Sequence, residues 1–282
     1  MKWNTLSKVL TYLAICIISF ILVFPVYWVI IPSFKPTKEM FSWPPKLYPE
    51  HLTLEHYIKL FTYYPETVTI DMPLYIRNSL LVCISASIIN MLISIPAGYA
   101  LARLTFKGKN TYKTTILLTQ MMPAVLFFVP IYLLFKHFGL INNLVSLVIV
   151  YPALVAPFSI IVSEAYISSI PREIEESALI DGAGLGSIIF RIIFPLSRPL
   201  MVALFTYSLI WTWNDLVIAL VLCHANEVRT ASVGLYSFIG SATIEWGGLL
   251  AGCTLCMLPP LLLFAVFQKY LIKGITAGAI KI

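Results

Sequence analysis

Charged residues are scarce in this chain of 282 residues: Asp, Glu, Lys and Arg make up 11% of it, against 59% hydrophobic residues. An ordinary soluble domain has roughly 25% charged residues, so too little charge is present to cover a surface that faces water. A disordered chain is excluded as well, because disorder requires low hydrophobicity. The composition therefore predicts a membrane protein whose main solvent is the lipid bilayer.

Cysteine and histidine give no sign of a reactive site. The five cysteines are scattered and odd in number, so no disulfide framework is predicted. Cys253 and Cys256 form a C-x-x-C pair in an apolar run without a nearby histidine, and packing residues explain them better than a redox or zinc site. The four histidines are dispersed in expected external loops, which argues against an intramembrane enzyme. We expect no catalytic residue and no metal site.

A nucleotide-binding loop is also missing. A Walker-type motif needs a glycine five residues before Gly-Lys, and the pair Gly108 and Lys109 has Arg103 at that place. We therefore expect this chain to bind no cofactor of its own. The net charge of +6 does not predict a nucleic-acid partner, because basic residues of membrane proteins collect in cytoplasmic loops.

Long apolar runs take up about half of the chain. A bilayer core of about 30 Å needs about 20 apolar residues in helical form. Six stretches meet this demand, and they are residues 9–31, 80–102, 114–135, 144–167, 199–222 and 247–267. The first is too long for a signal-peptide core and no cleavage site follows it. We predict an all-α membrane protein, residues 1–282 forming a single domain of six transmembrane helices.

The basic residues set the expected orientation. Counted over alternate loops, twelve Lys and Arg lie on the side of the N-terminus and seven on the other side. Cytoplasmic loops carry the excess of basic residues, so we expect both termini to face the cytosol, together with the loop at 168–199.

That loop, SSIPREIEESALIDGAGLGSIIFRIIFPLSRP, predicts a helix, a turn and a second helix. Pro171 suits the first turn of a helix, and the acids after it, Glu173, Glu175 and Glu176, suit the positive end of the helix dipole. The glycines at 182, 184 and 186 are expected to end this helix, with a positive φ at Gly182.

The second helix of the loop is predicted from its isoleucines. These lie at helical spacing and are Ile188, Ile189, Ile192 and Ile193. Pro195 and Pro199 are expected to end this helix before the fifth span begins. The loop would then form a compact projection on the cytoplasmic face. An ordinary amphipathic loop on the membrane surface is the alternative that composition alone leaves open.

The spacing of polar and small residues in the loop resembles a known signature. The residues that carry the resemblance are Glu176, Ser177, Ala178, Asp181, Gly182, Ile192 and Pro195. They are similar to the EAA loop of permease subunits in bacterial ATP-binding-cassette importers, although Ser177 and Phe194 stand where that family usually has Ala and Leu. The resemblance implies the type I importer permease fold. It also implies a coupling helix that docks in a cleft of a separate ATPase, where the acidic face around Glu173 and Glu176 meets basic groups.

Four further segments resemble carbohydrate permeases of the maltose type, specifically the smaller six-span partner of a heterodimer. They are FKPTKEMF, RNSLLV, WNDL at 213–216 and the tail GITAGAIKI. The resemblance implies half of a translocation pathway for a sugar or oligosaccharide, in a multi-pass protein of the bacterial cell membrane. It implies as partners a second permease, two ATPase subunits that hold ATP and Mg, and an extracytoplasmic solute-binding protein. The tail from 274 to 282 either reaches the ATPase or is a disordered end.

Two other classes of transport protein stay open. One is an importer permease for another small solute. The other is a stand-alone secondary transporter, which would more usually show repeat symmetry between its halves and buried charges on several spans. That class also leaves the 168–199 loop without an explanation.

Polar residues within the spans are candidates for the substrate pathway. An acid at mid-bilayer costs about 2.5 to 3.5 kcal/mol on insertion scales, so Asp215 needs a partner or water. With Asn214 and the neighbouring Trp211 and Trp213 it offers aromatic, amide and carboxylate groups that suit sugar hydroxyls. Hydrogen bonding between helices is the simpler interpretation and is favoured.

The third and fourth spans hold the remaining polar candidates. Gln120 with Met121 in the third span has the same two interpretations, pathway or packing. Pro123 and Pro130 are expected to kink that helix. Glu164, near the end of the fourth span, is expected to reach the interface or to pair with an arginine of the loop.

Overall fold

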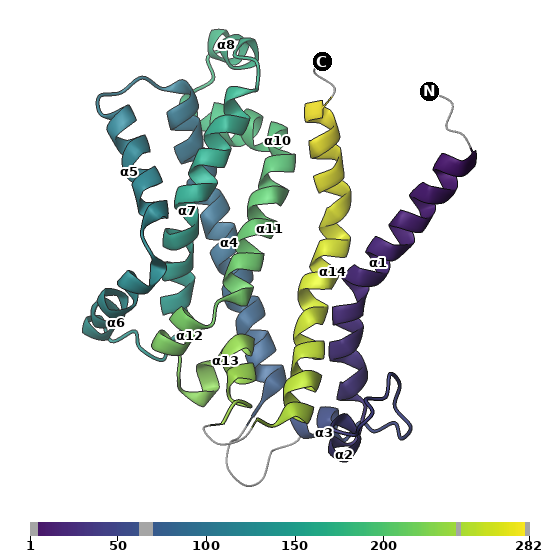
Figure 1. The fold of residues 1–282 in the computed structure, drawn as a ribbon. Helices are drawn as coiled ribbons and strands as arrows, with labels where there is room; N and C mark the ends of the chain where they lie inside the picture. Colours follow the sequence, from purple (N-terminus) through teal and green to yellow (C-terminus); the bar gives the residue numbers. More distant parts are fainter. Residues whose placement is uncertain (1–4, 62–69, 241–243, 280–282) are drawn as a thin grey trace. The chain divides into compact units, whose positions relative to one another are not determined.

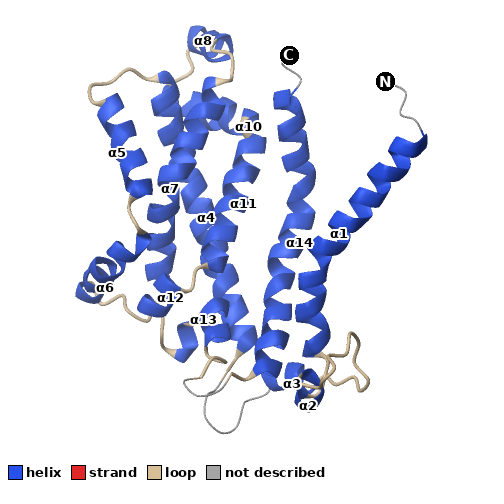
Figure 2. Cartoon of the chain, in the orientation of Figure 1, coloured by secondary structure: helices blue, strands red, loops and turns tan. Residues whose placement is uncertain are grey.

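The chain folds almost entirely as helix in a computed structural model, which describes residues 5–61, 70–240 and 244–279, without the side chains of 5–7 and 269–279. Apart from one isolated bridge between Ile239 and Ile244, no β-structure occurs in these ranges (Figure 2). The predicted all-α class is confirmed. The described residues form two compact units, one within 1–73 and 234–259 and the other within 74–233 and 260–282.

The first unit contains the N-terminal helix and a short helical segment that follows it (Figure 1). Its helices are α1 (Thr5–Ser33), α2 (Thr37–Met40), α3 (Glu55–Phe61) and the first part of α14 (Trp246–Ala279). The buried His56 of α3 lies against α14 at Gly247, where a Cβ would come within 2.2 Å of the imidazole. A side chain at position 247 would therefore displace the imidazole of His56.

The second unit is built on two long helices, α4 (Met72–Arg103) and α7 (Leu144–Ser168). They meet closely at Gly98, where a Cβ would lie 2.3 Å from the Cβ of Ser163. Around them lie α5 (Lys109–Met121), η1 (Ala124–Phe127), α6 (Phe128–His137), α8 (Glu173–Ile180), α9 (Leu185–Ser187), η2 (Ile188–Ile193), α10 (Phe194–Leu196), α11 (Arg198–Asn214), α12 (Val217–Leu222) and η3 (Asn226–Val228). Helix α13 (Ala231–Tyr236) begins in this unit, and its residues from 234 on belong to the first unit. Its largest core contains Leu147 and Tyr151 of α7 with Leu222 of α12.

Four of the six predicted spans are helices long and apolar enough to cross a membrane. They are Lys8–Ser33, Met72–Arg103, Leu144–Ser168 and Trp246–Gln268, and they correspond to the first, second, fourth and sixth expected spans. Several contain proline, which membrane helices tolerate because neighbouring groups satisfy the freed carbonyl.

The third expected span, 114–135, is broken. Helix α5 ends at Met121, and the helical segment that follows turns by 100°. Met122 is extended, with φ −78° and ψ 130°, because the ring of Pro123 disfavours helical backbone in the residue before it. The predicted kink at Pro123 is confirmed. Pro130 lies near the start of α6, which continues through it to His137, so the kink expected there is wrong.

The fifth expected span, 199–222, is also not one helix. Helix α11 ends at Asn214, Asp215 is extended with φ −68° and ψ 129°, and α12 begins at Val217. Up to six spans result if each of two bent pairs crosses the membrane once, and these pairs are Lys109–Met121 with Ala124–His137 and Leu185–Leu196 with Arg198–Asn214. The positions of the two termini relative to the membrane stay a prediction, as does the single domain 1–282.

Candidate functional site

The 168–199 loop has the predicted helix and turn. Helix α8 follows Pro171 and ends in a Schellman motif, in which Ala183 N–H donates to Ala178 O at 2.9 Å and Gly182 N–H donates to Leu179 O at 3.0 Å. Gly182 has the predicted positive φ, +79°. Gly184 has φ −76°, so the turn depends on one glycine and not on three.

The second helix of the loop is formed by α9, η2 and α10, which follow one another from Leu185 to Leu196. The direction then changes by 80° into α11, so this helix ends before the fifth span begins, as predicted. Pro195 lies in its last turn and Pro199 in the first turn of α11, so the end falls between the two prolines. Pro195 has no N–H, and the helix passes it after a wider π-helical turn in which Phe194 N–H donates to Ile189 O.

The apolar face of this second helix is buried as its amphipathic pattern predicts. Ile188 and Ile193 are 1% and 0% exposed, and they pack with Ile95 of α4, Ile167 of α7 and Leu204 of α11. The loop is therefore packed onto the ends of three long helices.

Glu175 fixes α8 to the end of α4. One of its carboxylate oxygens accepts from Arg103 Nε at 2.6 Å and the other accepts from Tyr99 OH at 2.9 Å. The guanidinium of Arg103 also donates to Ile170 O at 2.6 Å. The sequence marked Glu175 only as one of three acids in a first turn. Nothing in the sequence separated it from the neighbouring acids Glu173 and Glu176.

The opposite face of α8 carries the residues of the predicted docking surface. Glu173, Glu176, Ser177, Asp181 and Gly182 are exposed, while Ala178 is half-buried. Three apolar side chains stand among the acids, with exposed fractions of 40% for Ile174, 57% for Leu179 and 87% for Ile180. Apolar groups rimmed by charges are typical of protein-binding surfaces. Of the remaining signature residues, Ile192 is half-buried and Pro195 is exposed.

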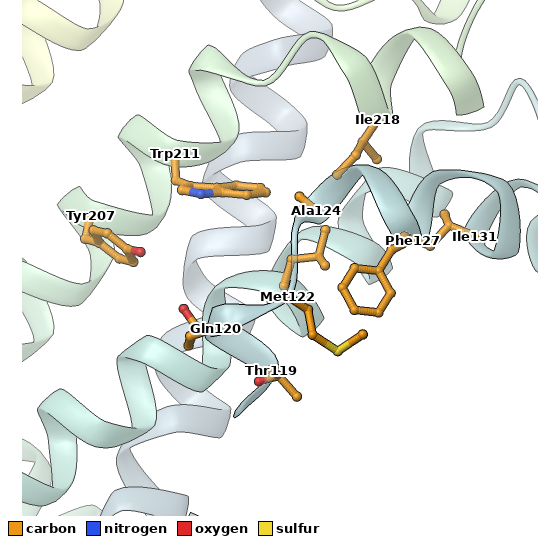
Figure 3. Close-up of a pocket in the computed structure, with 10 residues that line it drawn as sticks. Thr119, Gln120, Met122, Ala124, Phe127, Ile131, Tyr207, Trp211 and Ile218 are labelled. Atoms are coloured by element: carbon orange, nitrogen blue, oxygen red, sulfur yellow. The ribbon is translucent and has the colours of Figure 1, made fainter. Parts of the chain in front are cut away.

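A pocket of about 220 Å³ lies where the third expected span is broken. Figure 3 shows Trp211 and Tyr207 of α11 on one side of it, with Gln120 and Met122 on the other. Gln120 thus has the pocket position that a pathway residue would need. Met121 does not line the pocket and is 79% exposed.

The other predicted pathway residues lie outside this pocket. Trp213 is buried with Cys83 and Leu209, and the Asn214 amide donates to Ile210 O at 2.8 Å. Asp215 Oδ2 accepts from Tyr151 OH at 2.9 Å and from Ala219 N–H at 3.1 Å. These contacts give Asp215 the hydrogen-bonding role that the simpler interpretation expects.

Glu164 forms an ion pair with Lys113 of α5, with 2.8 Å between Oε1 and Nζ. The sequence predicted that Glu164 either reaches the interface or pairs with an arginine of the loop. Its printed ion-pair partner is a lysine of α5, so the pairing with a loop arginine is wrong. Within the described ranges no group of three His, Cys, Asp or Glu side chains could hold a metal ion.

Several long apolar helices and a packed helix-turn-helix loop at 168–199 are the features that a permease subunit of an importer is expected to have. Residues 94–277 match the family described as "Binding-protein-dependent transport system inner membrane component". The chain belongs to this family. It is a permease subunit of a binding-protein-dependent importer and a multi-pass inner-membrane protein.

Two relatives and one solved structure match almost the whole chain. The diacetylchitobiose uptake system permease protein DasC of Streptomyces coelicolor is 32% identical over 281 residues, covering 100% of both chains. The arabinooligosaccharides transport system permease protein AraQ of Halalkalibacterium halodurans is 31% identical and is also covered fully. A chain of a bacterial ABC transporter involved in import of the polysaccharide alginate has a TM-score of 0.78 at 18% identity, with 96% of this chain and 99% of that chain covered. The last similarity shows the importer permease fold.

Proposed function

We propose that this permease carries a sugar or oligosaccharide, as half of a heterodimeric pathway. The observation that carries the proposal is the pocket of Trp211, Tyr207 and Gln120. Aromatic faces pack against the C–H faces of sugar rings, and an amide donates to and accepts from hydroxyl groups. The carbohydrates named for DasC and AraQ favour the same class of cargo.

The exposed face of α8 supports an ATPase as one of the partners. A separate ATPase with basic groups around an apolar cleft would complement Glu173, Glu176 and Ile180. ATP and Mg would then be bound by two such ATPase subunits, and this chain would bind no cofactor. A second permease and an extracytoplasmic solute-binding protein complete the importer. The 168–199 loop and both termini face the cytosol in this arrangement.

Measuring uptake by the intact complex tests which class of solute the permease carries. Cells that express the whole system would be given labelled disaccharides and oligosaccharides, with an amino acid and a dipeptide as competing small solutes. We expect the cells to take up a carbohydrate and neither the amino acid nor the dipeptide. Gln120→Ala should raise the KM of uptake several-fold, because it removes a polar group from the pocket. Met121→Ala is the matched control, since that side chain lies next in sequence and outside the pocket. Uptake restricted to the amino acid or dipeptide would refute the carbohydrate assignment.

Gentle purification from the native membrane tests the partners. We expect a second permease and an ATPase pair to accompany the chain, and substitution of Ile180 by Glu to release the ATPase while the two permeases stay together. A chain that transports its cargo alone, without ATP, would instead support a secondary transporter.

A further inference from the structure

The ion pair between Arg103 and Glu175 is unusual in being almost fully buried. The side chains are 7% and 8% exposed, and the nitrogen and oxygen are 2.6 Å apart. Both carboxylate oxygens have a donor, because Tyr99 OH binds the second one. A buried pair of this kind must be fully hydrogen-bonded, since taking two charges out of water is costly.

Glu175 is also the one buried side chain of α8. The other residues of this eight-residue helix are exposed or half-buried, so the main tie between α8 and the long helices is a charged contact to α4. A charged, hydrogen-bonded contact has a fixed direction, whereas an apolar contact allows sliding.

The N-terminal end of α4 is also held by hydrogen bonds. Asn78 Nδ2 donates to Glu227 O and to Arg229 O, both at 3.0 Å, and Ser79 Oγ accepts from Ala231 N–H at 2.8 Å. Tyr75 OH donates to Asn226 Oδ1. The helix has 32 residues, about 48 Å at 1.5 Å per residue. One continuous helix therefore joins the 168–199 loop to the 226–231 segment.

We propose that Arg103 and Glu175 are positioning residues that make α4 move together with α8. Movement that an ATPase imposes on α8 then reaches the 226–231 segment through α4, as a rigid-body displacement. The inference rests on the proposed function, in which α8 docks on a separate ATPase. It assigns the coupling step to a residue pair inside the permease, distinct from the exposed docking face.

The test uses the whole importer in proteoliposomes and measures solute transported per ATP hydrolysed. Glu175→Gln removes the charge and keeps the volume, and we expect it to lower this ratio at least tenfold while the ATPase remains bound. The reversed pair, R103E with E175R, should restore part of the ratio. Glu164→Gln is the control, because it removes one partner of the Lys113 ion pair, which lies outside the loop, and it should leave the ratio unchanged.

A second readout separates positioning from folding. Amide hydrogen exchange in residues 226–231 should change on ATP binding in the parent complex and should not change in Glu175→Gln. If Glu175→Gln fails to accumulate, the apolar pair R103M with E175M keeps the packing and replaces it in both measurements. The inference would be overturned if either variant transported as much solute per ATP as the parent complex. It would also be overturned if ATP changed the exchange of residues 226–231 in the variant as it does in the parent. A parent complex that hydrolyses ATP without importing carbohydrate would refute the proposed function instead.

Discussion

Two acids of the second unit, Glu175 and Asp215, are held in different ways. Glu175 has a cationic partner, Arg103, and accepts a second hydrogen bond from the hydroxyl of Tyr99, and both partners belong to α4. Asp215 has only uncharged donors, a tyrosine hydroxyl and the N–H group four residues further on, and among the described residues no Lys or Arg forms an ion pair with it. The charged contact joins segments 72 residues apart. The hydrogen bond of Asp215 with Tyr151 also joins distant segments, 64 residues apart, and its bond with Ala219 N–H stabilises the start of α12.

Removal of the Glu175 carboxylate should have the largest effect on stability. Glu175→Ala leaves the guanidinium of Arg103 buried without its counter-charge, which costs about 3–5 kcal/mol. We expect a marked fall in the midpoint of thermal unfolding of the purified complex. Glu173→Ala, an exposed acid of the same helix, should change stability by no more than about 0.5 kcal/mol. Equal midpoints for the two variants would show that the ion pair contributes nothing.

Removal of the Asp215 carboxylate should have a smaller effect. Asp215→Ala leaves a tyrosine hydroxyl and a backbone N–H unsatisfied, at a cost of about 1–3 kcal/mol. Asp215→Asn should cost less, because the amide oxygen still accepts. If Asp215→Asn destabilised the protein more than Glu175→Gln, the comparison would be reversed. Unchanged substrate preference in Asp215→Asn would favour the hydrogen-bonding role over a pathway role.

Gly182 offers a third and more local test. A non-glycine residue in left-handed backbone costs about 1–2 kcal/mol, and nothing lies within 4 Å of the position of a Cβ, so the cost is in the backbone alone. We expect Gly182→Ala to shift the end of α8 and reduce uptake, with normal amounts of protein in the membrane. Gly184→Ala is the matched control, since φ there is −76°. Equal uptake by the two variants would argue against a role of this turn in docking.

These differences show what a single sequence reveals. The turn at Gly182 was predictable because its chemistry is local: a helix end followed by a glycine. The pair of Arg103 and Glu175 was not, because several acids of the loop were equivalent until the fold selected one. Trp211 and Trp213 show the same limit, since residues two apart on a helix point about 200° apart. The sequence offered both rings, and packing placed one in the pocket and the other in the core.

The size of the break in the third span and the whole break at Asp215 in the fifth were not predicted, for a related reason. The hydropathy of residues 114–135 measures how favourably the segment enters lipid. It carries no information on whether the helix bends within the segment. Pro123 was recognised as a kink, but its size, 100°, depends on the extended backbone at Met122. No proline marks the break at Asp215. Helix α11 ends there because the backbone of Asp215 is extended and its carboxylate accepts a hydrogen bond from Ala219 N–H of α12.

Glu39, a half-buried acid of the first unit, is held more weakly than Glu175 and Asp215. Glu39 Oε1 accepts from Glu50 N–H at 2.7 Å, and Oε2 accepts from His51 N–H at 3.3 Å. The hydrogen bond from the Glu50 backbone lowers the pKa of Glu39 below its ordinary value of 4.5, against a smaller opposing effect of desolvation. Backbone donors thus favour its charged form, as they do for any carboxylate that caps a turn.

The sign of this effect fixes its pH dependence. Because folding lowers the pKa of Glu39, its contribution to stability is present at neutral pH and is lost as the pH falls below the ordinary value of 4.5 and through the folded pKa. Glu39→Gln should therefore lower the unfolding midpoint slightly at pH 7, and the difference from the parent should shrink toward pH 3. Solvent screening keeps this effect the smallest of the series. A difference that grows as the pH falls would mean that protonated Glu39 is the better acceptor, and the loop at residues 46–51 would then be held by contacts other than this carboxylate.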